Sequence, residues 1–193
     1  MKNLRVKKVY GSAAVLASAL FFGSYGIWSR LIGDGMGNFF QGWTRALILV
    51  ALILPFVLWR KEIVRIHKRD WFWLAVFLAC TSLTQAPLFY AFNHMDIGTA
   101  SLLFFVSMFI TMNVIGIGFL REKTTRVKII AVIIAVVGMY FVFSFSVASF
   151  SLLAALMAIV NGVASGGEVA FSKKLTSGYS PLYIVLLSWI IIF

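Results

Sequence analysis

Long apolar runs, separated by short polar segments, make up almost the whole chain. An α-helix rises 1.5 Å per residue and the hydrocarbon core of a bilayer is about 30 Å thick, so a spanning helix needs about 20 apolar residues. A last run, 182–193, reaches only about 18 Å. The pattern predicts an all-α integral membrane protein, a helical bundle of about six full spans plus a partial seventh. The six full runs are residues 11–32, 39–59, 71–95, 97–120, 129–146 and 150–172.

Composition supports this prediction. Hydrophobic residues form 62% of the chain and charged residues 12%, whereas a soluble domain is about half apolar and a quarter charged. The net charge of +11 does not indicate nucleic acid, because the basic residues form short clusters between apolar runs instead of one folded face. We therefore expect a lipid bilayer as partner and no nucleic acid. The single cysteine, Cys80, excludes an intrachain disulfide.

The basic residues indicate the orientation in the membrane. Fifteen of the 17 Lys and Arg lie in the N-terminal segment 1–10 and in the connections after the second, fourth and sixth runs. The other connections hold none, apart from Arg30 at the end of the first run. Cytoplasmic loops carry the excess of Lys and Arg. We therefore expect a cytoplasmic N-terminus, an uncleaved first helix and a multi-pass protein of the plasma or inner membrane.

A weak internal repeat relates the first run to the sixth. An offset of 143 residues pairs Gly23 with Gly166 and Ser29 with Ser172. The first helix would cross the membrane outward and the sixth inward, so a repeat of five helices must be inverted. Inverted repeats are a common construction of secondary transporters.

The stretch 90–143 carries a further pattern of small residues, a turn glutamate and a helix glycine. It resembles the strongest stretch of the drug/metabolite transporter superfamily, in particular its EamA-type members. One departure is that Ser107 is followed by Met108 and not by the proline frequent in the family, so no kink is expected there. The matching residues are Ala91, Ala100, Ser101, Leu102, Leu103, Glu122 and Gly138.

The resemblance implies a ten-helix transporter of two inverted five-helix repeats. On this interpretation residues 1–10 are a cytoplasmic segment, 11–146 the first EamA repeat and 149–193 the start of an incomplete second repeat. The partial last span then reflects a chain that stops before the repeat does. The implied function is secondary transport of small metabolites or drugs, by export or exchange, through alternating access.

Two charged residues lie at membrane depth, where such residues are costly and often functional. Arg45 lies about 10 Å below the outer face by helix rise, with Gln41 one turn away. It contacts an anionic group, acts as an ion-pair partner, or extends to the headgroups. Glu168 lies about 8 Å from the inner face. It either carries a proton for coupled transport or lies in cytoplasmic water at the edge of a cavity. Because helix rise places the two about 12 Å apart in depth, no direct pair is predicted.

Uncharged candidates complete the predicted cavity. The resemblance implies that helices 1, 3, 4 and 6 line a central cavity. One polar stripe on the third helix contains Thr81 and Gln85, and one on the sixth contains Asn161 and Ser165. A separate row of Ala158, Gly162 and Gly166 predicts a helix contact face. The candidate substrate-binding residues are Tyr25, Trp28, Gln41, Arg45, Gln85, Asn161 and Glu168.

No nucleophile–base pair, phosphate-binding loop or metal spacing appears, so an enzyme or an ATP-driven pump is disfavoured and no cofactor or metal is expected. His94, which has no second His or Cys near it, is a poor metal candidate. Two other classes remain open: a seven-helix receptor or sensor, and an accessory membrane protein without transport. The former is disfavoured by the cytoplasmic N-terminus, and a retinal protein also by the absence of lysine from 182–193.

Overall fold

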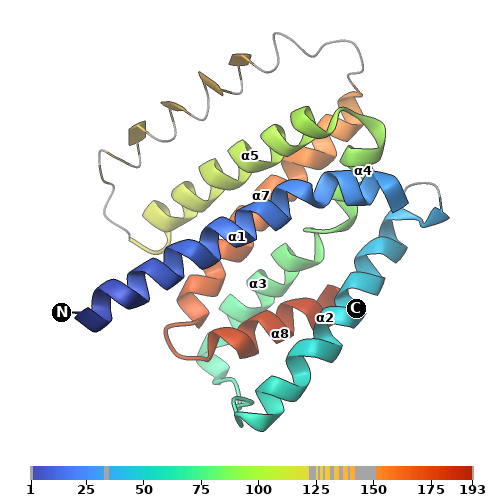
Figure 1. The fold of residues 1–193 in the computed structure, drawn as a ribbon. Helices are drawn as coiled ribbons and strands as arrows, with labels where there is room; N and C mark the ends of the chain where they lie inside the picture. The colour runs from blue at the N-terminus through green and yellow to red at the C-terminus, as the bar shows by residue number, and fades with distance from the viewer. Residues whose placement is uncertain are drawn as a thin grey trace.

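The computed structural model describes residues 2–32, 35–121, 125, 127, 129–130, 133–134, 137–138, 140–141 and 151–192. These residues form helices and connections, with no β-strand among them. The helices and their arrangement are drawn in Figure 1. They are α1 (Lys2–Ile32), α2 (Asn38–Trp59), the short 3-10 helix η2 (Lys68–Asp70), α3 (Trp71–Ser82), α4 (Ala86–His94), α5 (Ile97–Gly118), α7 (Leu152–Leu175) and α8 (Pro181–Ile192).

Helix α7 is the most buried of the apolar helices and packs along α5, α3 and α4. Its contact with α5 is close because it has no side chain at Gly162 and Gly166. A Cβ atom built at Gly162 would overlap the Phe104 carbonyl oxygen, and one at Gly166 would lie 2.6 Å from the Met108 carbonyl oxygen. The predicted contact face is confirmed. Helix α5 is continuous from Ile97 to Gly118, through residues 107–108.

The predicted third span, 71–95, is not one continuous helix. Helix α3 ends at Ser82, and α4 begins at Ala86 with Pro87 in its first turn. Proline has no N–H for the carbonyl four residues earlier, and its ring clashes with that carbonyl. The helix therefore breaks over residues 83–85. The predicted stripe through Thr81 and Gln85 was wrong as a continuous helix face, because the break separates the two residues.

Helix α1 lies at the edge of the bundle, and in Figure 1 it crosses in front of α7. It contacts mainly α4. The Arg30 guanidinium donates to the carbonyl oxygens of Phe92 at 3.0 Å and Met95 at 2.8 Å, at the end of α4. A cation is favoured there, because the last carbonyls of a helix are unpaired and carry partial negative charge. Arg30 thus has a structural role, which explains why it interrupts the charge pattern.

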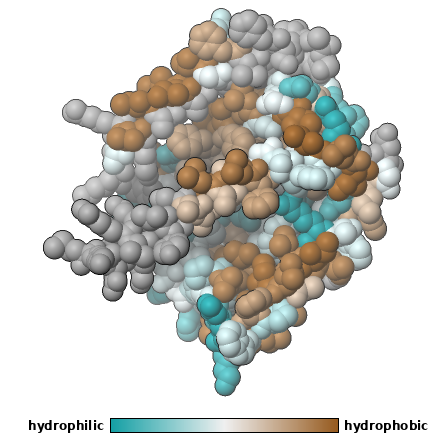
Figure 2. Space-filling model, viewed as in Figure 1, coloured by the Kyte–Doolittle hydropathy of each residue, from teal (hydrophilic) through white to brown (hydrophobic). Residues whose placement is uncertain are grey.

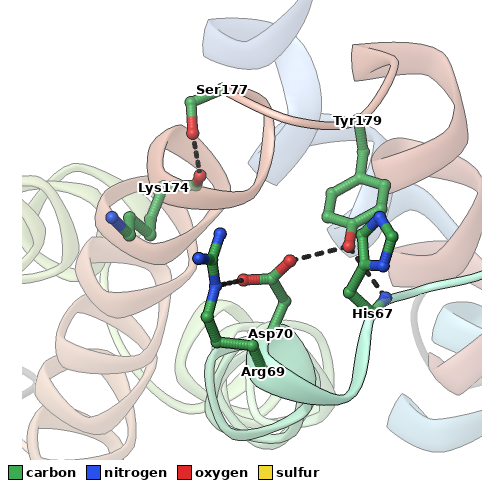
Figure 3. A network of polar contacts seen from close by, with 6 residues as sticks. All are labelled: His67, Arg69, Asp70, Lys174, Ser177 and Tyr179. Carbon is green, nitrogen blue, oxygen red and sulfur yellow. Dashed lines mark hydrogen bonds and ion pairs between the residues drawn. The ribbon is translucent and has the colours of Figure 1, made fainter.

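The α2–α3 connection and the α7–α8 turn meet at one end of the bundle (Figure 3). The Tyr179 hydroxyl accepts from the His67 backbone N–H at 3.0 Å and donates to Asp70 at 2.7 Å. The hydrogen bond from His67 lowers the pKa of Tyr179, but desolvation and the Asp70 carboxylate raise it by more, so the pKa lies above 10.0. Two connections that the charge pattern assigned to one side of the membrane therefore lie together.

Large apolar side chains cover much of the surface, and brown regions dominate the face shown in Figure 2. Leu20 is 78% exposed, Phe39 82% and Trp59 79%. Patches of this extent are rare on soluble monomers, whereas lipid solvates them. Among the described residues, five segments are long and apolar enough to span a membrane, one of them formed by α3 and α4 together, and α8 is a shorter apolar helix.

Several sequence predictions fall on residues outside the described ranges. Glu122 lies there, as does much of the predicted fifth span, 129–146. The proposed boundaries at residues 146 and 149 also lie outside. The sixth span differs slightly from its prediction: α7 runs from Leu152 to Leu175, where 150–172 was expected.

Candidate functional site

A cavity of ≈ 230 Å³ lies where helices from the N-terminal and C-terminal halves of the chain meet. Its wall combines α1, α2, the α3–α4 break, α5, α7 and α8. Aromatic and aliphatic side chains form much of the wall, with a few polar groups among them, which is the usual make-up of a small-molecule site. The lining residues are Phe22, Tyr25, Arg45, Thr84, Gln85, Leu88, Phe104, Met108, Asn161, Ser165, Glu168, Val169, Ser188, Trp189 and Ile192.

Asn161 anchors α7 to the helix break at one side of the cavity. It is fully buried, and its amide nitrogen donates to the carbonyl oxygens of Leu83, at 3.4 Å, and Thr84. Pro87 leaves the Leu83 carbonyl without its helical partner, so Asn161 supplies a donor that the broken helix lacks. The Asn161 side-chain oxygen has no hydrogen-bond partner among the described residues. This buried acceptor remains available to a donor on a bound molecule.

Arg45 is held against aromatic rings inside the bundle. Its guanidinium carbon lies 4.0 Å from the centroid of the Tyr25 ring and 5.8 Å from that of Trp189. The Tyr25 hydroxyl donates to the Gln85 side-chain oxygen at 3.1 Å. Arg45 therefore lies against the cavity wall.

Glu168 brings a carboxyl group to the same cavity. It interacts with the hydroxyl of Thr81, which donates to the Phe77 carbonyl oxygen at 2.9 Å. The ion pairs found among the described residues are Arg60–Glu62 and Arg69–Asp70. Arg45 and Glu168 thus line one cavity without an ion partner in the part of the chain that the structure describes. The structure shows no ion pair between Arg45 and Glu168.

A second cavity, of ≈ 380 Å³, lies between α1 and α2. Its wall includes Trp28, which is 61% exposed, and Gln41, which is buried. Tyr25 and Arg45 line both cavities. The contact between these two side chains therefore lies at the boundary between the cavities.

Gln41 helps to hold α1 and α2 together. Its side-chain oxygen accepts from the Ser29 hydroxyl at 3.1 Å, and its nitrogen donates to the Met36 carbonyl oxygen at 3.1 Å. Trp28 and Gln41 thus line the second cavity and not the first, and they share that second cavity with Tyr25 and Arg45.

The structure joins five of the seven predicted residues in one cavity: Tyr25, Gln85, Arg45, Asn161 and Glu168. Sequence reasoning missed Thr84 and Trp189. Pro87 could have indicated Thr84, since a broken helix exposes carbonyls near it. Nothing local to Trp189 distinguishes it from the other aromatic residues. Among the described residues, no group of three His, Cys, Asp or Glu is placed to hold a metal ion; the His94 ring stacks on Tyr90.

Comparison with known proteins adds one match. The sequence profile of the EamA-like transporter family matches residues 9–144, more than half of the chain. Neither the curated proteins nor the solved structures gave a match. The matched range includes Tyr25, Arg45 and Gln85, whereas Asn161 and Glu168 lie beyond it.

Proposed function

Because the chain belongs to the EamA-like transporter family, we propose that it is a secondary transporter whose central cavity binds a small solute carrying both a negative and a positive group. The observation that carries this proposal is the placement of Arg45 and Glu168 on one cavity wall without ion partners among the described residues. Family membership and the apolar helices make the chain a multi-pass membrane protein of the drug/metabolite transporter type.

The charges define the class of solute. A charge buried in a low-dielectric site is costly unless it is paired. A carboxylate of the solute would pair with Arg45, whose planar guanidinium suits that geometry, and an ammonium group would pair with Glu168. The free oxygen of Asn161 accepts a further hydrogen bond from the ammonium group. The cavity, at ≈ 230 Å³, is smaller than most sites for drug-sized ligands, so the solute is small.

The boundary between the two cavities provides a gate for alternating access. Tyr25 and Arg45 line both cavities and contact each other. A cation–π contact contributes only about 0.5–2 kcal/mol, so a solute that draws Arg45 away can open the boundary. Binding at the central cavity would then be linked to exchange with the cavity between α1 and α2.

Glu168 and Thr81 provide a route for proton coupling. A protonated Glu168 can donate to the Thr81 hydroxyl oxygen, while that hydroxyl keeps its bond to Phe77. An ionised Glu168 cannot donate, so the Thr81 hydroxyl must turn toward the carboxylate and leave Phe77. The two protonation states therefore favour different hydrogen-bond arrangements next to the solute. We take the proton as the coupling ion.

The test is uptake of labelled solutes into vesicles that contain the purified full chain. A panel of small zwitterions, anions and cations is offered with and without an imposed pH gradient. We expect uptake of zwitterions by the wild type, loss of uptake in Arg45→Gln, and loss of the response to the gradient in Glu168→Gln. Arg69→Gln, which removes a largely exposed charge, is the control and should behave as the wild type.

Two outcomes would contradict these assignments. Unchanged uptake by Arg45→Gln would show that Arg45 does not bind the solute. An unchanged gradient response in Glu168→Gln would leave Glu168 as a cavity-edge carboxylate without a coupling role.

The orientation and repeat organisation belong to the same proposal. A cytoplasmic N-terminus follows from the loop charges, and a first inverted repeat over 11–146 with a second beginning at 149 follows from the family resemblance. Reporter fusions at Gly35 and Lys68 should report the external and cytoplasmic sides respectively. The reverse pattern would contradict the orientation.

A further inference from the structure

We propose that a groove beside the α2–α3 connection binds one anionic phospholipid, with its headgroup on two cations and its acyl chains on an apolar wall. The groove has a volume of ≈ 510 Å³ and joins the connection to the starts of α3 and α8. We call it the loop groove. Its lining residues are Ile63, Val64, Arg65, Ile66, Lys68, Trp71, Leu74 and Tyr183.

The cations of the loop groove have no acidic partner among the described residues. The connection contains two carboxylates, Glu62 and Asp70. Glu62 lies 3.8 Å from Arg60 and accepts from Ser180. Asp70 lies 3.9 Å from Arg69 and accepts from Tyr179, as Figure 3 shows.

Arg65 and Lys68 are therefore left without a carboxylate within ion-pair distance among the described residues. Both line the loop groove and both are exposed. Two unpaired cations on one groove attract an anion, and a phosphate group offers the oxygen acceptors that Arg and Lys bind best.

The rest of the wall distinguishes a lipid from a soluble phosphate. Ile63 is 50% exposed, Val64 45% and Trp71 64%, although all three border the cations. A free phosphate would leave these apolar side chains in contact with water, whereas the upper acyl chains of a phospholipid cover them. Tryptophan is also enriched at the headgroup level of a bilayer.

The floor of the loop groove is fixed by the core of the protein. Ile66 and Leu74 pack with the buried cluster around Phe77, and Tyr183 packs with Val57. The bond from the His67 N–H to Tyr179 holds the connection against the α7–α8 turn. The binding surface is thus formed before the lipid arrives, which reduces the entropy lost on binding.

The experiment measures lipid binding to the purified full chain in detergent by native mass spectrometry. Phosphatidylglycerol is the anionic probe, phosphatidylcholine the neutral one, and glycerol phosphate the soluble one. The test variant is Arg65→Gln/Lys68→Gln. The control variant, Arg69→Gln/Lys174→Gln, removes the same charge at the same end of the molecule, from residues outside the loop groove.

We expect the wild type to prefer phosphatidylglycerol, and the test variant to bind it roughly 25-fold more weakly, at about fivefold for each cation. The control should keep wild-type binding. No preference for phosphatidylglycerol over phosphatidylcholine would overturn the proposal, as would equal losses in both variants, which would show a general effect of surface charge. Equal occupancy by glycerol phosphate would overturn it in favour of a soluble anion.

Discussion

Two neighbouring faces of α7 carry opposite kinds of residue. The face toward α5 consists of Ala158, Gly162 and Gly166, where the α5 backbone leaves no space for a Cβ atom at either glycine. The face toward the cavity carries Asn161, Ser165 and Glu168. The first face is defined by residues with a methyl side chain or none, and the second by polar side chains.

The difference indicates how a membrane helix divides its roles. Lipid tails are as apolar as the helix surface, so close backbone packing and interhelical hydrogen bonds hold helices together. The α5 face of α7 provides the close packing, and Asn161 provides a hydrogen bond to the helix break. The remaining polar residues of the cavity face contribute little to packing, which leaves them free for solute and proton.

The largest effect is expected at the packed face. Gly162→Val places a branched side chain against the Phe104 carbonyl and the Ser107 side chain, and overpacking costs about 1–3 kcal/mol or more. We expect a loss of about 3 kcal/mol in the free energy of unfolding, measured by denaturant titration in micelles. Gly23→Val is the matched control, since a Cβ atom there meets nothing within 4 Å. Equal losses in both variants would show that valine in a helix, and not the contact, is responsible.

The next effect concerns the one cavity-face residue that also supports the fold. Asn161→Leu leaves the Leu83 and Thr84 carbonyls without their donor, and an unsatisfied buried acceptor costs about 1–3 kcal/mol. Asn113→Leu is the control, because the Asn113 side chain donates to Phe109, a carbonyl within its own helix. A thermal unfolding series should show the larger loss for Asn161→Leu. The reverse ranking would contradict the role assigned to the helix break.

A smaller loss is expected at the turn that follows α7. Tyr179→Phe removes the hydroxyl that bonds His67 and Asp70, although water can replace it at this end of the bundle. Because the pKa of Tyr179 is raised above 10.0, its contribution is complete below pH 10 and decreases as the pH rises through the folded-state pKa. The difference in thermal stability between wild type and Tyr179→Phe should therefore shrink at high pH. A difference that grows with pH would contradict the raised pKa.

The smallest effect is expected at Ser165. Its hydroxyl borders the cavity and makes no hydrogen bond to the residues that the structure describes. Ser165→Ala should change the free energy of unfolding by less than about 0.5 kcal/mol, while solute affinity measured by calorimetry can still change. A loss comparable to that of Asn161→Leu would show that the cavity face as a whole supports the fold.

The sequence by itself determined the membrane class, most helix bounds and the packed face of α7. These follow from local properties: the length of an apolar run, the excess of basic residues in alternate connections, and small residues four positions apart. The run 97–120 became α5 almost residue for residue. The run 71–95 did not become one helix. Its hydropathy is high despite Pro87, but this proline interrupts the helical hydrogen bonds of the backbone.

Only the tertiary structure decided which polar residues meet. Tyr25 and Gln85 are 60 positions apart and share a hydrogen bond, and Arg45 lies against Trp189 from the far end of the chain. Gln41, one turn from Arg45, is instead committed to Ser29 and Met36. The rotation of each helix about its axis sets these contacts, and that rotation depends on how all the helices pack together. A one-dimensional pattern of hydrophobicity places a residue at a depth in the membrane, but only packing determines its neighbours.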